Sequence, residues 1–115
     1  MNDNSEQRRA ARKRALDPID VTDALTGENL GRVGNLSREG MMLIGSRQLN
    51  DDALYQVRFQ LRDHAGKPHV LEAGVHEQWS EPAAISGQYW AGLRMIALSD
   101  ADATILAEWL DEAET

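Results

Sequence analysis

The strongest constraint on the fold is a strict alternation of apolar and polar residues in the segment 55–62, "YQVRFQLR". In an extended chain its apolar side chains all fall on one face: Tyr55, Val57, Phe59 and Leu61. A strand with one apolar face has to bury that face against other elements, and the polar face remains in water. This pattern is typical of an antiparallel sheet that is half-buried.

Shorter segments of the same kind recur along the chain, separated by turns that contain glycine, proline or asparagine. We expect further strands at 19–25, 30–37, 41–46, 69–79 and 88–98. The alternation places Leu71, Ala73 and Val75 of one strand, and Leu93, Met95 and Ala97 of another, on the core face, with Leu25 ending the first apolar row. The connections are too short for the crossovers that parallel strands require.

The periodicity changes after residue 98. Ser99 is a good helix N-cap and is followed by Asp100 and Asp102, whose charges the helix dipole favours in a first turn. Apolar residues then recur at helical spacing: Ile105, Leu106, Trp109 and Leu110. We therefore predict a mainly β protein, a small six-stranded antiparallel β-barrel with a C-terminal amphipathic helix at about 99–112.

The chain of 115 residues has room for one domain, and its charge is divided unevenly. Residues 1–14 carry five basic and two acidic groups, a net charge of +3, whereas residues 15–115 carry seven basic and seventeen acidic groups, a net charge of −10. We expect a flexible basic arm at 1–14 and a barrel domain at 15–115. The acidic body argues against a DNA- or RNA-binding protein.

No run of apolar residues is long enough for a membrane span or a secretory signal, so we expect a cytoplasmic protein that is not inserted in a membrane. The chain has no cysteine, which excludes a disulfide framework and a thiolate nucleophile. The three histidines lie at loop and strand positions without the spacing of a metal site. No nucleophile–base pair or pair of carboxylates supports catalysis, so we expect neither an enzyme nor a metal or cofactor.

Two short motifs contain polar groups suited to an anionic ligand. The first, "RRAAR" (8–12), separates Arg8 and Arg12 by three residues, and arginine offers a planar fork for phosphate or a guanine edge. The second, "NLSREG" (35–40), places Asn35 and Ser37 on the same face of a strand. Taken singly, the first is compatible with a solvated tail and the second with a hairpin turn capped by its polar side chains.

Together, Arg8-Arg9-Ala10-Ala11-Arg12 and Asn35-Leu36-Ser37-Arg38-Glu39-Gly40 resemble the RxxxR and [D/N]xSxxG motifs of the PilZ domain family. The resemblance covers roughly residues 7–111 and includes the strands, "GLRM" (92–95) and the final helix. Met95 stands where the family often has phenylalanine, a core position that methionine can fill. Arg9 and Lys13 have the same spacing as Arg8 and Arg12, but lysine lacks the bidentate fork.

The resemblance implies binding of cyclic di-GMP, a bacterial second messenger with two phosphates and two guanines. It assigns ligand contacts to Arg8, Arg9, Arg12, Asn35, Ser37 and Gly40, and secondary contacts to Lys13 and Trp79. Gly40 would permit a positive φ or a close approach of the backbone to the ligand. Arg38 and Glu39 are expected to be spacers that face solvent. An arm that becomes ordered on binding would then signal through a protein effector that the sequence does not identify.

Three positions and two alternatives remain open at this point. Trp79 shares the parity of Leu71, Ala73 and Val75, which places it in the core unless a bulge reverses it, and Trp90 and Trp109 are also expected to pack in the core. One alternative function is a PilZ-like adaptor that docks on a protein without binding cyclic di-GMP. The other, a nucleic-acid-binding barrel, requires a basic groove with exposed aromatic residues, which the acidic body opposes.

Overall fold

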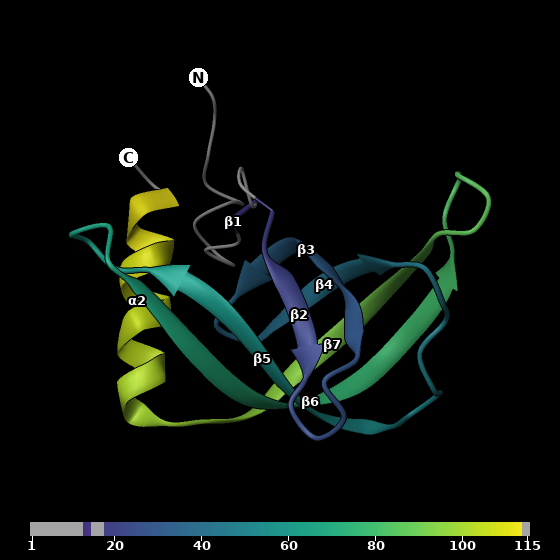
Figure 1. Ribbon diagram of the computed structural model, residues 1–115, viewed down its shortest axis with the longest axis horizontal. Helices are drawn as coiled ribbons and strands as arrows, with labels where there is room; N and C mark the ends of the chain where they lie inside the picture. Colours follow the sequence, from purple (N-terminus) through teal and green to yellow (C-terminus); the bar gives the residue numbers. More distant parts are fainter. Residues whose placement is uncertain (1–12, 15–17, 114–115) are drawn as a thin grey trace.

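We analysed a computed structural model of the chain, which describes residues 13–14 and 18–113. Six antiparallel strands form a closed β-barrel, and one helix follows them (Figure 1). The strands are β2 (Asp20–Asp23), β3 (Asn29–Ser37), β4 (Gly40–Gly45), β5 (Leu54–Arg62), β6 (Pro68–Pro82) and β7 (Tyr89–Leu98). Their order is β3-β2-β5-β6-β7-β4, and the pairing of β4 with β3 closes the ring. The expected barrel is confirmed.

A short additional strand, β1 (Lys13–Arg14), pairs with the C-terminal half of β3, whereas β2 pairs with its N-terminal half. The paired backbone thus begins inside the segment expected to be the arm. Because β2 is only four residues long, it meets β5 at two positions, Thr22 with Arg58 and Asp23 with Val57. The rest of β5 is covered by the helix α2 (Asp100–Ala113), which also contacts β1 and β6.

The core consists of the inward-facing side chains of all six strands, and β5 shows the reason for this most clearly. Val57, Phe59 and Leu61 are almost fully buried, while the residues between them are exposed or half-buried. Leu106 and Leu110 of α2 complete the same core cluster, with Ile105 and Trp109 packed against it. The apolar alternation and the helical stripe therefore converge on one core, as the sequence predicts.

Local polar groups fix the ends of α2. The Ser99 hydroxyl accepts a hydrogen bond from the Asp102 backbone N–H at 3.1 Å, which confirms the predicted N-cap. The Asp102 carboxylate in turn accepts from the Glu72 N–H of β6 at 3.0 Å. Near the other end, His64 of the β5–β6 loop lies 2.9 Å from a Glu112 carboxylate oxygen. Hydrogen bonds to both ends of α2 thus hold it against the barrel.

A β-bulge changes the side-chain pattern near the end of β7. On β7 the register shifts at Ile96, so that Ala97 is exposed and Leu98 takes the inward position. The expectation that Ala97 faces the core is therefore wrong, because an inserted residue reverses the alternation. Leu25 is also exposed, since it lies in the turn after β2 and not in a strand.

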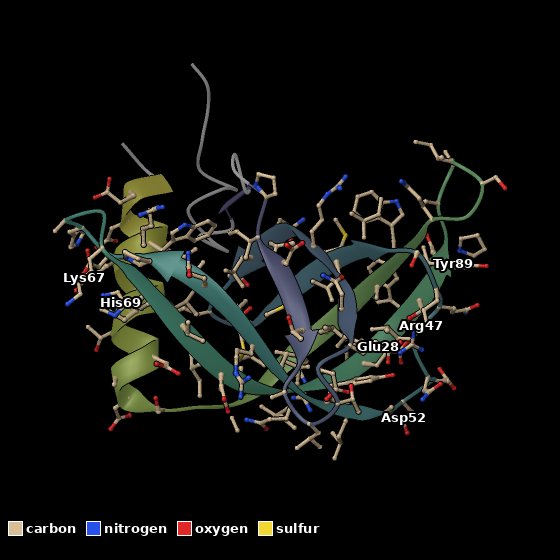
Figure 2. All side chains as sticks on the ribbon, in the orientation of Figure 1. Glu28, Arg47, Asp52, Lys67, His69 and Tyr89 are labelled. Carbon is tan, nitrogen blue, oxygen red and sulfur yellow. The ribbon has the colours of Figure 1, made fainter. Side chains whose placement is uncertain are left out.

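Side-chain pairs at opposite ends of the barrel join its loops (Figure 2). At one end, the Arg47 guanidinium lies 2.9 Å from Glu28 and ties the residue before β3 to the loop after β4. At the end covered by α2, His69 at the start of β6 lies 2.8 Å from Asp63, the first residue of the β5–β6 loop. Both pairs are at least partly exposed to water, so we assign them a modest contribution to stability.

Candidate functional site

The hairpin of β3 and β4 carries the "NLSREG" motif, with Ser37 paired to Gly40 and a two-residue turn between them. Ser37 is buried. Its hydroxyl accepts a hydrogen bond from the Glu39 N–H at 3.2 Å and donates to the Gly40 carbonyl at 3.4 Å. The serine therefore tightens the turn from within. A direct contact of Ser37 with a ligand remains a prediction.

Asn35 is the motif residue with an unused hydrogen-bonding group. It lies on the same face of β3 as Ser37, opposite the buried Leu36. Its side-chain oxygen Oδ1 is buried and has no hydrogen-bond partner in the part of the chain that the structure describes. A buried acceptor without a partner costs about 1–3 kcal/mol of stability unless another group supplies the missing hydrogen. Among the described residues, the Asn35 side-chain oxygen is therefore an orphan acceptor.

Gly40 has a packing role that the sequence did not reveal. It is absent from the described residues with positive φ, so the first of the two roles expected for it, a left-handed backbone, is excluded and the close approach to a ligand stays a prediction. A Cβ at Gly40 would collide with the carbonyl oxygen of Leu93 on β7. The glycine is required because two strands of the barrel approach each other closely.

The end of the basic arm lies directly beside the motif. In the pairing of β1 with β3, Lys13 is opposite Leu36 and Arg14 is opposite Asn35. Arg8, Arg9 and Arg12 lie outside the described residues, and only the backbone of Lys13 is described. The register nevertheless places the backbone of Lys13 and Arg14 against β3, beside Asn35 and its orphan acceptor.

Trp79 does not pack in the core, contrary to its parity along β6. A bulge at Gln78 lets Glu77 pair with Leu93 and Trp79 with Gly92, so one residue of β6 is extra. Glu77 takes the inward position and is 2% exposed, whereas Trp79 is 41% exposed. The bulge reverses the alternation and turns the indole to the outer surface. Trp90 is also only half-buried and lies over Gly34, outside the core cluster, whereas Trp109 packs on the core as expected.

A pocket of about 190 Å³ lies between the hairpin turn and the indole. Trp79 and Gln78 come from β6, Gly92 and Arg94 from β7, and Glu39 from the turn, with Gly40, Met41, Met42 and Leu93 completing the lining. Sequence reasoning missed Arg94 and treated Glu39 as a spacer. Alternation does place Arg94 opposite the buried Leu93, but the bulge that brings Trp79 next to it has no local sequence signal.

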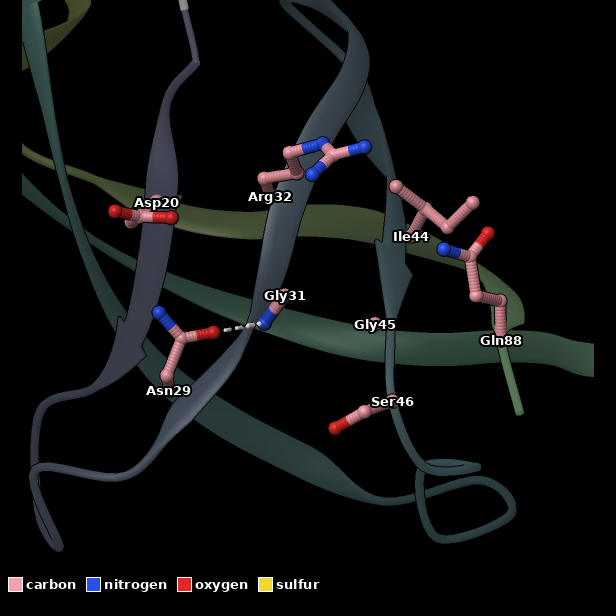
Figure 3. Close-up of a pocket in the computed structure, with 8 residues that line it drawn as sticks. All are labelled: Asp20, Asn29, Gly31, Arg32, Ile44, Gly45, Ser46 and Gln88. Atoms are coloured by element: carbon pink, nitrogen blue, oxygen red, sulfur yellow. Dashed lines mark hydrogen bonds between the residues drawn. The ribbon is translucent and has the colours of Figure 1, made fainter.

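A second pocket, of about 250 Å³, lies over the N-terminal half of β3 and shares no lining residue with the first (Figure 3). Asp20 of β2, Arg32 of β3 and Gln88 of the loop before β7 contribute side chains to it. The Asn29 side-chain oxygen accepts a hydrogen bond from the Gly31 N–H at 2.8 Å and is thus already engaged. The charges of Asp20 and Arg32 oppose each other, so this pocket indicates no particular ligand.

Among residues 13–14 and 18–113, no group of three or more histidine, cysteine, aspartate or glutamate side chains could hold a metal ion. Within the same residues no helix is both long and apolar enough to cross a membrane.

A scan against protein-family models gives no match, and no curated protein matches the sequence. Solved structures do match the fold. The PilZ domain of CeSA from a cellulose-synthesizing bacterium superposes with a TM-score of 0.61 at 16% identity, covering 90% of this chain and 98% of that one. The fold is PilZ-like. This confirms the resemblance that the two motifs and the strand pattern predict.

Two further structures share the PilZ-like fold. The PilZ domain of YcgR from Escherichia coli, solved with c-di-GMP, has a TM-score of 0.58 at 16% identity and covers 94% of this chain and 92% of its own. The inhibitor of motility MotI/DgrA from Bacillus subtilis has a TM-score of 0.74 at 12% identity, with 93% of this chain covered. The chain spans about half the length of MotI/DgrA.

Proposed function

We propose that the chain is a non-enzymatic receptor for cyclic di-GMP whose basic arm and β3–β4 hairpin bind the dinucleotide together. The observation that carries the proposal is the register of β1, which pairs Arg14 with Asn35. The two residues that directly follow the RRAAR motif thus lie against the strand that carries the second motif, which supports a joint site. YcgR, whose PilZ domain was solved with c-di-GMP, shares this fold.

The chemistry of the site suits this ligand. Arginines of the arm can bind phosphate oxygens or the guanine O6 and N7 atoms with two parallel hydrogen bonds. The Asn35 oxygen is an acceptor without a partner among the described residues, and guanine offers N–H donors. Trp79, with its indole partly exposed beside the hairpin turn, offers a surface on which a base can stack.

Calorimetry of the full chain with cyclic di-GMP tests the proposal. We expect saturable binding by the wild type and a loss of at least roughly tenfold in Arg12→Ala and in Asn35→Ala, the effect of one strong hydrogen bond. Arg38→Ala is the matched control, since it removes an exposed arginine of the turn that does not line the pocket. Absence of binding by the wild type would refute the proposal.

Asn35→Ala separates function from folding. Because the substitution removes a buried acceptor that has no partner among the described residues, we expect the unfolding midpoint of the variant to stay the same or to rise while binding weakens. A variant that loses stability and binding together would instead indicate that Asn35 is a structural residue.

The chain would transmit occupancy to a protein effector, to which an arm that becomes ordered on binding would present a new surface. One observation favours the alternative of an adaptor that does not bind the nucleotide. The Ser37 hydroxyl is satisfied by two hydrogen bonds within the turn, so a buried serine is explained there without a ligand. A nuclear magnetic resonance titration distinguishes the two. Shifts of the amides of residues 7–14 with cyclic di-GMP favour the receptor, and an arm whose amides do not shift favours the adaptor.

A further inference from the structure

The pocket beside the hairpin turn combines a flat aromatic surface with two opposite charges. The Trp79 indole lies across Gly92, where a Cβ would overlap its Nε1, Cε2 and Cζ2 atoms. Gly92 thus lets the ring lie flat on β7. Arg94, two residues further along the same strand, and Glu39 of the turn line the same pocket.

The backbone of Glu39 is held on both sides. Its N–H donates to the Ser37 hydroxyl at 3.2 Å, and its carbonyl accepts from the Met95 N–H at 2.8 Å. Arg94 is the partner of Gly40 across the β4–β7 pairing, so the two charges come from adjacent positions. Within the described part of the chain, neither side chain takes part in an ion pair. Both charged groups therefore remain available to a ligand on the indole.

Guanine is the base that fits this set of groups. Its Watson–Crick edge presents the N1–H and N2–H donors side by side, which match the two oxygens of a carboxylate. Its O6 and N7 acceptors match a guanidinium, and its ring stacks on an aromatic face. The Watson–Crick edge of adenine has one donor beside an acceptor and cannot satisfy a carboxylate in this way.

We infer that Glu39 is a specificity-determining residue that accepts hydrogen bonds from N1–H and N2–H of one guanine of the ligand. The inference rests on the proposed function and adds to it the group that selects guanine over other bases. Charge-assisted hydrogen bonds of this kind are roughly twice as strong as neutral ones.

The inference and simple electrostatics predict opposite effects of removing the Glu39 carboxylate on the affinity for cyclic di-GMP. Cyclic di-GMP is a dianion, so a nearby carboxylate repels it, and Glu39→Ala would strengthen binding if the carboxylate made no contact with the base. If Glu39 reads the base, the same substitution weakens binding. The sign of the change therefore distinguishes the two effects.

The test is calorimetry of the full chain at constant ionic strength with cyclic di-GMP and with its hypoxanthine analogue, which lacks the exocyclic N2 amine. We expect the wild type to prefer cyclic di-GMP by roughly ten- to a hundredfold and Glu39→Ala to lose affinity for it by a similar factor. The variant should lose most of the preference for cyclic di-GMP over the analogue. Glu81→Ala is the control, because it makes the same charge change at an exposed position of β6 that does not line the pocket.

Each outcome has a distinct meaning. If the wild type binds no cyclic di-GMP, the proposed function fails and the inference fails with it. If the wild type binds but Glu39→Ala binds as tightly or more tightly, the inference is overturned and the proposed function stands. Weaker binding with the guanine preference unchanged also overturns it. Equal melting temperatures of Glu39→Ala and wild type show that the variant is folded.

Discussion

Gly92→Ala is the substitution whose effect the structure predicts most sharply. A glycine replaced by alanine in a compatible conformation usually stabilises a protein by about 0.4–1 kcal/mol, because the unfolded chain becomes less flexible. At Gly92 the new methyl group would overlap the Trp79 indole, a rigid ring. We expect the ring to be forced off β7 and the sign of the effect to reverse.

The burial of Trp79 limits the size of this effect. The residue is 41% exposed, so roughly three fifths of a side chain that can bury about 150–250 Å² is covered. At about 25 cal/mol per Å² of apolar surface, complete displacement of the ring costs about 2–4 kcal/mol. After the gain from the unfolded chain is subtracted, we expect Gly92→Ala to lower the free energy of unfolding by about 1–3 kcal/mol.

Urea unfolding followed by circular dichroism measures this change, and a red shift of tryptophan emission reports the displaced indole. The control is the double-mutant cycle with Trp79→Ala. In that background the overlap no longer exists, so Gly92→Ala should be neutral or stabilising by up to about 1 kcal/mol. Equal destabilisation in both backgrounds would refute the assignment of the overlap to the indole.

Two further predictions concern stability away from the pocket. Glu77→Gln should lower the free energy of unfolding by about 1.5–3 kcal/mol in urea titrations, because the buried carboxylate accepts hydrogen bonds of 2.7 Å from the Asp52 N–H and the Ser80 hydroxyl, and an amide supplies one acceptor less. A change below about 0.5 kcal/mol would contradict this role. The hydrogen bond to Glu112 raises the pKa of His64 above its ordinary value of 6.5. The His64–Glu112 pair therefore stabilises the folded state fully below pH 6.5, and this stabilisation is lost as pH rises through the raised pKa. Unfolding midpoints measured across that range should show this loss in the wild type and not in His64→Gln; equal slopes would exclude the pair as its origin.

The predictions from sequence succeeded where the signal is local. Alternation placed Val57, Phe59 and Leu61 in the core, because in a half-buried strand the period of two is a direct consequence of the pleat. The N-cap at Ser99 was equally readable, since the capping hydroxyl and the first helical N–H groups are only a few residues apart. These two kinds of signal sufficed for a barrel followed by a helix.

The predictions failed where a side chain depends on a distant strand. The bulge at Gln78 arises from the pairing register of β6 with β7, and no residue of β6 indicates it in the sequence. Its consequence, an exposed Trp79, was therefore missed, whereas Glu77 precedes the bulge and is buried by the same alternation as Val75. The Glu77 carboxylate accepts a hydrogen bond from the N–H of Asp52, twenty-five residues earlier, a separation over which sequence alone indicates no contact.

The pairing of β1 with β3 has a consequence for the thermodynamics of the arm. Because Lys13 and Arg14 are fixed against the hairpin, the preceding residues are tethered within a short chain length of Asn35. If cyclic di-GMP binds at the hairpin as proposed, contacts from these residues would form within one molecule, at the millimolar effective concentration that a short linker gives. The same basic peptide supplied in solution would have to approach that concentration to replace it. In the proposed receptor, the two paired residues would thus set how readily the arm competes with water and salt for cyclic di-GMP.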